Sequence, residues 1–168
     1  MICRGWAKVK DGDVTEGQAH LRTGSAAYRA AGAQLFVPHY LDLQAAACEI
    51  VGQIEEAVSL LDDALQIVGR TGERWLEADL NRHKGELLLR QGHTEVADEL
   101  YHKALSIARE QGAKLWELRV TASLARLRLD QRRRTEAQDL LAPVYDWFNE
   151  GFDTPDLKEA KALLDELT

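Results

Sequence analysis

Apolar residues along this chain follow the spacing of amphipathic helices, and no segment alternates as a half-buried strand would. One stripe recurs at intervals of four, four and three residues: Val96, Leu100, Ala104 and Ile107. The pattern predicts nine helices, over about residues 2–10, 14–31, 33–51, 54–70, 73–91, 94–111, 113–130, 134–149 and 155–167. The sequence therefore predicts an all-α fold.

Small residues return every forty positions. Two glycine series do so with an offset of twenty: Gly12, Gly52 and Gly92, then Gly32, Gly72 and Gly112. Two other series are Gly5, Ala45, Gly85 and Ala125, and Gly17, Ala57, Ala97 and Ala137. Glycine after a helix supplies a left-handed conformation that residues with a Cβ resist, so the two glycine series mark two helix ends per unit. We expect the other small residues to let paired helices approach closely.

This period organises the whole chain, residues 1–168, as one repeat domain. It contains a partial first repeat (1–32), three full repeats (33–72, 73–112 and 113–152) and a C-terminal capping helix (153–168). About half of the first helix is missing, so we expect a fragment or a shortened gene product. Because terminal repeats need polar caps, the apolar end left in this way is expected to drive self-association into a homo-oligomer.

Two helix starts and three tryptophans complete the structural expectations. Asp13 with Glu16 predicts a capping box, and Thr154 is the expected N-cap before Pro155. Large aromatic side chains at helical spacing are usually core residues. We expect Trp75, Trp116 and Trp147 in the core, and Ile67, Ile107 and Trp147, forty apart, as successive core layers.

Composition narrows the function classes. Hydrophobic residues make up 45% of the chain and the formal net charge is −7, so a general nucleic-acid binder is excluded and the run Arg132–Arg134 is expected in a solvated turn. Cys3 and Cys48 have no disulfide-framework spacing, and there is neither a signal-peptide core nor an apolar run long enough for a membrane. We expect a soluble, cytoplasmic protein.

The repeat unit resembles the tetratricopeptide repeat (TPR). That family places a small residue on the first helix, a glycine seven residues later, and alanines five and twelve residues after the glycine. Two units match it in full: Gly85, Gly92, Ala97 and Ala104, and Ala45, Gly52, Ala57 and Ala64. The third unit departs from it, with Arg132 in the glycine place and Val144 in the last alanine place. The resemblance implies a right-handed α–α superhelix of an extended subtype, since the usual period is 34 residues.

A narrower resemblance covers most of the chain. Residues 27–35, 71–89 and 147–167 are similar to the C-terminal TPR region of large bacterial regulators that join a class III cyclase domain, or a transcriptional activator domain, to a signal-transducing ATPase. Neither the metal-binding aspartates of the cyclase nor a GxxxxGK[ST] phosphate loop is present. The resemblance implies the sensory or scaffolding tail of such a protein, without its catalytic parts.

Catalytic and metal chemistry find little support in the sequence. HExxH, CxxC and GxSxG motifs are absent, and we predict no cofactor and no bound metal. A two-helix metal site from His39, His83 and Glu86 is conceivable, and an enzyme using His83 and Glu86 is the weakest function hypothesis. The alternative for these side chains is ordinary solvated helix surface.

A concave groove is the stronger candidate. The TPR resemblance places the first helix of each pair on the concave face. It gives ten candidate groove residues: His39, Asp42, Glu49, Asp79, Arg82, Glu86, Arg90, Arg119, Ser123 and Arg126. The arginines are expected either to clamp carboxylates of a partner or to pair with neighbouring acidic residues. We predict a non-catalytic scaffold that binds a protein segment or a neighbouring domain. The alternative is a sensor with a small molecule in the groove.

Overall fold

The computed structural model describes residues 1–168 and contains nine α-helices and no strand. They are α1 (Ile2–Lys10), α2 (Val14–Ala30), α3 (Val37–Ile50), α4 (Ile54–Thr71), α5 (Glu77–Arg90), α6 (Thr94–Glu110), α7 (Lys114–Asp130), α8 (Arg134–Tyr145) and α9 (Pro155–Leu167). The predicted all-α fold class is confirmed. None of the nine helices combines the length and the hydropathy that crossing a lipid bilayer requires.

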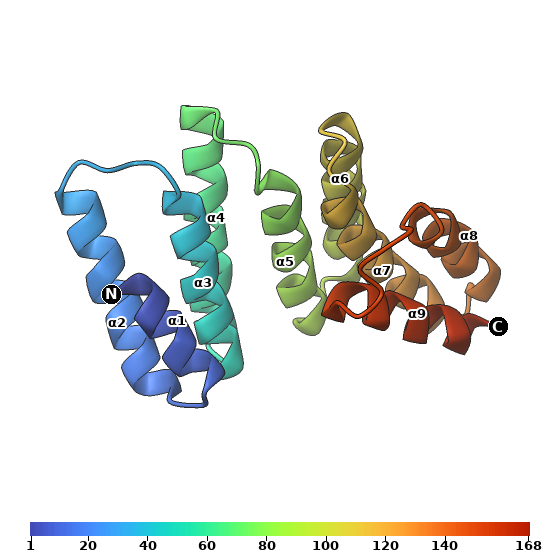
Figure 1. Cartoon of the computed structure of the whole chain (residues 1–168), viewed down its shortest axis with the longest axis horizontal. Helices are drawn as coiled ribbons and strands as arrows, with labels where there is room; N and C mark the ends of the chain where they lie inside the picture. The colour runs from blue at the N-terminus through green and yellow to red at the C-terminus, as the bar shows by residue number, and fades with distance from the viewer.

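Consecutive helices form hairpins that stand side by side in an elongated array (Figure 1). We call the first helix of each pair an A helix (α1, α3, α5, α7) and the second a B helix (α2, α4, α6, α8). α9 packs on α7 and α8, where the A helix of a further pair would lie. A helices contact one another at α1–α3, α5–α7 and α7–α9, whereas neighbouring B helices hardly approach each other. The A helices therefore line the inner, concave side.

Left-handed residues end the helices at the predicted places. All six glycines of the two forty-residue series have positive φ, between 63° at Gly112 and 93° at Gly12. Arg132, which replaces glycine in the third unit, adopts the same conformation with φ 62°. The departure from the repeat pattern thus leaves the turn intact, although a residue with a Cβ is strained there.

Close contact between A and B helices explains the small-residue series. A Cβ on Gly85 in α5 would lie 2.7 Å from Cε1 of Tyr101 in α6. A Cβ on Gly5 would lie 2.8 Å from the backbone nitrogen of Leu21, and one on Gly17 would lie 2.5 Å from Cγ2 of Val9. Larger residues would push the hairpins apart. These contacts fix where each A helix lies relative to its partner.

The core is divided along the array, as expected when each unit contacts only its neighbours. The largest cluster joins α3, α4 and α5, and a second joins α7, α8 and α9. The expectation of a tryptophan core is wrong for two of the three: Trp75 is 42% and Trp147 59% exposed, while Trp116 is half-buried. The predicted stack of Ile67, Ile107 and Trp147 fails for the same reason, because Trp147 follows the end of α8.

Three helix bounds differ from the prediction. α3 begins at Val37 and not near residue 33, because Phe36 takes a left-handed conformation (φ 62°) that keeps the preceding segment out of the helix. α5 begins at Glu77 and not near residue 73, after the left-handed Gly72. α8 ends at Tyr145 and not near residue 149. Pro143 lies in its last turn and lacks the N–H that a continuing helix uses.

Predicted caps and one apolar position need correction. The Asp13 side chain accepts from the backbone N–H of Glu16 at 3.4 Å, but the Glu16 carboxylate binds Lys8 and His20 and does not return to Asp13, so half of the capping box forms. Thr154 occupies the N-cap position, yet its hydroxyl donates to the carbonyl of Gly151. Val96 is 46% exposed and Leu100 is half-buried, so the buried stripe of α6 runs instead through Ala97, Tyr101 and Ala104.

The turn geometry generates a stability prediction. Gly72→Val should lower the free energy of unfolding by about 1–2 kcal/mol, because a β-branched residue must then adopt positive φ. Gly69→Val is the matched control: Gly69 lies within the helix that Gly72 ends, has no neighbour close to its Cβ position and has helical φ, so the change should stay within about 0.5 kcal/mol. Urea unfolding measures both. Equal effects would contradict the helix-end role of Gly72.

Candidate functional site

The A helices enclose a groove made of two adjoining cavities, which we call the concave groove. One cavity, of about 370 Å³, is lined by side chains from α1, α3, α5 and α7. The other, of about 190 Å³, is lined by side chains from α5, α7 and α9. Arg82, Glu86 and Arg119 line both cavities and therefore stand at the centre of the groove.

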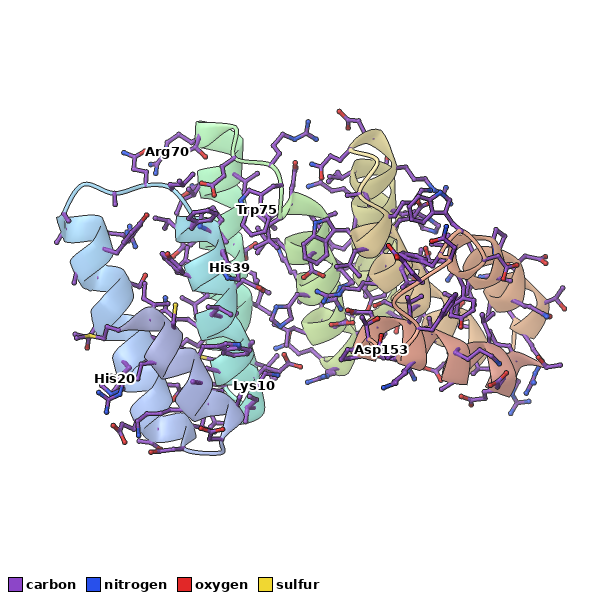
Figure 2. The ribbon with its side chains drawn as sticks, viewed as in Figure 1. Lys10, His20, His39, Arg70, Trp75 and Asp153 are labelled. Atoms are coloured by element: carbon purple, nitrogen blue, oxygen red, sulfur yellow. The ribbon has the colours of Figure 1, made fainter.

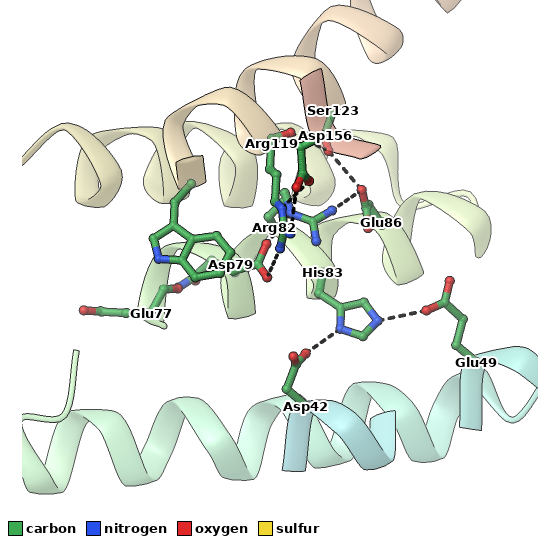
Figure 3. Close-up of polar contacts among 12 residues, drawn as sticks. Asp42, Glu49, Glu77, Asp79, Arg82, His83, Glu86, Arg119, Ser123 and Asp156 are labelled. Carbon is green, nitrogen blue, oxygen red and sulfur yellow. Dashed lines mark hydrogen bonds and ion pairs between the residues drawn. The ribbon is translucent and has the colours of Figure 1, made fainter. Parts of the chain in front are cut away.

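His83 joins two A helices within this groove. Its imidazole reaches from α5 to α3, with Nδ1 2.7 Å from Oδ1 of Asp42 and Nε2 2.9 Å from Oε2 of Glu49 (Figure 3). A ring that faces an acceptor at both nitrogens donates at both only when it is protonated. Burial disfavours the charged form, but the hydrogen bonds and charges of the two carboxylates outweigh burial and raise the pKa of His83 from 6.5 to about 9.

The junction between α3 and α5 depends on such side-chain contacts, because the two backbones hardly approach each other. Glu49 also pairs with Arg90 at 2.5 Å. The hydrogen bond from His83, with the charges of His83 and Arg90, holds the pKa of Glu49 below its usual value against the effect of burial. At the start of the two helices, the Trp75 ring packs edge-on against Phe36, with centroids 6.0 Å apart.

Arg82 points the opposite way from its neighbour His83, toward α7 (Figure 3). Its Nε donates to Asp79 at 2.6 Å and its Nη1 donates to Glu86 at 2.5 Å, while the hydroxyl of Ser123 donates to the same Glu86 oxygen at 2.9 Å. Burial opposes the charge of Arg82, but its two carboxylate partners outweigh burial and raise its pKa. Both carboxylates lie on α5 with the arginine, and the link to α7 is made by Ser123 through Glu86.

Arg119 continues the network toward α9. Its Nε and Nη2 donate to the two carboxylate oxygens of Asp156 at 2.6 and 3.1 Å, a bidentate pair, and its Nη1 lies 3.4 Å from Asp79. The guanidinium also lies over the Trp116 ring, 4.9 Å from the centroid. Farther along the same helix, Arg126 donates to Glu159 at 3.0 Å. Every groove arginine thus has an acidic partner inside the chain.

The structure gathers eight of the ten predicted groove residues around the two cavities: Asp42, Glu49, Asp79, Arg82, Glu86, Arg119, Ser123 and Arg126. Arg90 lies beside them through its ion pair with Glu49. His39 lies apart, half-buried against Trp75 near the start of α3, with the ring centroids 5.8 Å apart. Of the two expectations for the arginines, pairing with neighbouring acidic residues describes their contacts.

The suggested metal and acid–base sites are not assembled. His83 binds Asp42 and Glu49, whereas Glu86 binds Arg82 and Ser123 and His39 stacks on Trp75. The hypothesis of a His39–His83–Glu86 site is therefore wrong, because neighbouring acidic and basic groups hold these side chains in different directions. No group of three or more His, Cys, Asp or Glu side chains is arranged to hold a metal ion.

Sequence reasoning missed groove residues at both ends of the array. Trp6 and Lys10 of α1 line one cavity, and Asp156 and Glu159 of α9 line the other. The forty-residue register could have identified Glu159, which follows Arg119 by forty positions as Arg119 follows Asp79. The sequence prediction assigned α9 only as a capping helix and therefore did not include Glu159 in the groove.

Comparisons with known proteins place this fold. The chain matches the TPR-like repeats of a putative kinesin light chain from Podosopora anserina with a TM-score of 0.74 and 19% identity, covering 99% of this chain and 82% of that one. BtubC (BKLC) from P. vanneervenii gives a TM-score of 0.74 and 16% identity, covering 95% of this chain and 74% of that one. The chain therefore has the fold of a TPR-like helical solenoid, as its sequence predicted.

A sequence relative is more similar but much longer. Over 129 residues the chain is 30% identical to an uncharacterized protein of Rhizobium meliloti (strain 1021), a match that covers 76% of this chain and 12% of that protein. The chain thus corresponds to a small part of the length of that relative. No protein-family model matches the chain.

The His83 contacts generate a pH prediction. Since the pKa of His83 is raised to about 9 in the folded protein, its contribution to stability is complete below about pH 6.5 and is lost as the pH rises through 9. The loss should be about 3 kcal/mol. Urea unfolding of wild type and His83→Gln between about pH 6 and pH 10 measures it as a shrinking difference between the two proteins. A difference that does not change with pH would refute the doubly bonded imidazolium.

Proposed function

We propose that this chain is a non-catalytic protein-interaction module whose concave groove binds a segment of another protein or of a neighbouring domain. One observation carries the proposal: the charged groove side chains are bonded to one another across the A helices, as in His83 with Asp42 and Arg119 with Asp156. A surface held in this way needs little ordering when a partner binds, which reduces the entropic cost of association.

The polarity of the groove favours a protein segment over a small molecule. Small-molecule sites are mostly apolar with a few polar groups. In the cavity between α5, α7 and α9 only Leu118 and Ala122 are hydrophobic, and the other lining residues are charged or hydroxylic. Its arginines and carboxylates balance in charge, so polar backbone groups and side chains of either sign find partners at its rim. The sensor hypothesis lacks the apolar pocket that it needs.

The same module is proposed to be the sensory or scaffolding tail of a larger signalling protein of the ATPase or cyclase type. The resemblance of residues 71–89 and 147–167 to such tails supports this context, as does the small share of the Rhizobium relative that the chain covers. Partner binding in the groove would then bias an attached output domain. Both thiols, Cys3 and Cys48, are free, which suits a reducing compartment such as the cytoplasm.

Self-association through the N-terminal end is a further part of the proposal. α1 is shorter than the other A helices, and Ala27 and Ala31 at the end of α2 are exposed, as is Met1 at 66%. Apolar surface at the end of a repeat array favours contact with a second copy of the chain.

Sedimentation equilibrium should show a dimer of the chain that dissociates on dilution. A strict monomer at high concentration would contradict this contact.

Groove binding is testable with peptides. Random dodecapeptides displayed on phage should be enriched by the full chain, and the selected peptides should lose at least about tenfold in affinity for Arg126→Ala, because Arg126 is a half-exposed groove arginine. Arg22→Ala is the matched control. Arg22 is equally exposed and also pairs with one glutamate, Glu56, but it lies on the B helices.

The two variants decide between the faces of the solenoid. The proposal predicts affinities within about twofold of wild type for Arg22→Ala, measured by fluorescence anisotropy. Loss of binding in Arg22→Ala with retention in Arg126→Ala would transfer the site to the convex face. Failure to enrich any peptide above a protein-free selection would contradict the interaction module itself.

A further inference from the structure

A cavity outside the concave groove lies at the edge of the solenoid, where α2 ends and α3 begins. It has a volume of about 190 Å³ and is lined by Arg29 and Arg70, by the loop residues 32–34 and by an apolar floor of Val37 and Ile67. Figure 2 shows Arg70 at the end of α4, beside the α2–α3 loop. Two arginines from different helices thus border one cavity, which we call the edge pocket.

Neither edge-pocket arginine has a partner within the chain. Arg29 and Arg70 are both exposed, and neither forms an ion pair or a side-chain hydrogen bond, although the chain carries a net charge of −7. Each groove arginine, by contrast, binds at least one carboxylate, as Arg126 does with Glu159. The edge pocket therefore presents two positive charges that no internal group neutralises.

The equivalent arginine in a later repeat shows which partner this position has elsewhere in the molecule. Arg109 stands eighty residues after Arg29, and its Nε donates to Glu117 at 2.9 Å. Glu117 also accepts from Lys114 at 2.7 Å and is buried, with 5% of its surface exposed. The residue eighty positions before Glu117 is Val37, on the floor of the edge pocket. The edge pocket therefore has the equivalent arginine, Arg29, but a valine in place of the glutamate that binds it.

The junction between α4 and α5, which lies one repeat before Glu117, supports the same comparison. Forty residues before Glu117 stands Glu77, and it accepts from Nε of Arg74 at 2.6 Å. Two of the three junctions from a B helix to the next full A helix thus supply a glutamate of their own, bound by a cation three residues earlier. At the first junction these positions are Gln34 and Val37, so the chain supplies no equivalent carboxylate there.

The surroundings of the edge pocket indicate what carries such a carboxylate. Leu35 is 58% and Phe36 42% exposed, directly after the loop residues that line the pocket. The backbone N–H groups of Ala33 and Gln34 have no acceptor within the chain. An extended peptide would find hydrogen-bond donors, an apolar contact and paired positive charges together here.

We propose that the edge pocket binds a peptide segment through a carboxylate side chain seated between Arg29 and Arg70, with a neighbouring apolar side chain on Leu35 and Phe36. The carboxylate stands in for the one that Glu117 supplies to Arg109 two units later. This site lies outside the concave groove and does not require the groove to bind anything. It gives the solenoid a second contact with acidic, partly apolar sequences.

A structural role for the two arginines makes a different prediction. Both lie in the last turn of a helix, where a cation stabilises the helix dipole. That role requires no ligand and no preference for acidic peptides, so peptide titration separates it from the proposed site.

The probes are the blocked tetrapeptide Ac-Gly-Glu-Leu-Gly-NH2, its glutamine analogue and inorganic phosphate. Titrated into the full chain and followed by NMR, the glutamate peptide should shift the side-chain Nε–H signals of Arg29 and Arg70 and the amide of Gly32, with millimolar affinity. The glutamine analogue should bind at least about fivefold more weakly, since it lacks the charge. Equal binding of the two peptides, or phosphate binding as tightly as the glutamate peptide, would overturn the proposal.

Variants complete the test. Arg29→Gln and Arg70→Gln should each reduce affinity for the glutamate peptide at least about fivefold. Arg22→Gln, an exposed arginine on the same helix as Arg29, and Arg126→Ala in the groove should leave that affinity unchanged. Melting curves establish that all four variants remain folded, which their exposed positions lead us to expect. Unchanged affinity in both edge variants would overturn the site, whereas an unresponsive Arg126→Ala separates it from the groove.

Discussion

The candidate sites of this protein depend on one constraint: an A helix begins about every forty residues and packs against its B partner in the same way each time. Left-handed residues such as Gly72 end the helices at fixed places, and Gly85 lets an A helix contact Tyr101 of its B partner directly. Side chains about forty residues apart then face each other across neighbouring A helices, as Asp79 and Arg119 do. The groove is a consequence of this register.

Ion pairs among the side chains of neighbouring A helices shape the concave groove. Burying an imidazolium or a guanidinium is costly unless hydrogen-bonded partners of opposite charge accompany it. His83 and Arg82, adjacent in sequence, each meet this condition with two carboxylates, which lie on α3 for His83 and on the arginine's own helix α5 for Arg82. Asp79 and Glu86, which hold Arg82, also accept from Arg119 and Ser123 of α7, so contacts around this pair link three successive A helices. At α3 and α5, where backbone contact is sparse, these polar contacts act together with the hydrophobic cluster that the two helices share with α4.

The sequence predicted the fold because its periodic signals are local. Glycine at a helix end and small residues at a helix contact act within one unit, so repetition every forty residues reveals them. Loop conformations were less accessible. The left-handed Phe36 delays α3, and nothing in its residue type signals positive φ. Trp75 and Trp147 were assigned to the core from size and spacing, but both lie where one helix has ended and the next has not begun.

The sequence predicted which residues line the concave groove, but it did not predict which partner each of them binds. Helix periodicity places Arg82, Glu86 and Arg119 on one face, but it does not tell which carboxylate each side chain binds. That choice depends on the distance between helices and on competing partners. His83 was treated as a possible metal ligand because Glu86 lies one turn away on the same helix and His39 lies on the preceding A helix, whereas its partners Asp42 and Glu49 are distant in sequence. The edge pocket was not predictable from the sequence, because it combines the ends of α2 and α4 with the loop between α2 and α3.

The concave groove depends most directly on the charged contact of His83 between α3 and α5. A double-mutant cycle with His83→Gln, Asp42→Asn and the combined variant, measured by urea unfolding at neutral pH, gives the coupling free energy of that contact. A buried charge-assisted hydrogen bond predicts a coupling of about 1.5–3 kcal/mol. Additive effects, within about 0.5 kcal/mol, would show that the two helices are held by something else and would contradict the account.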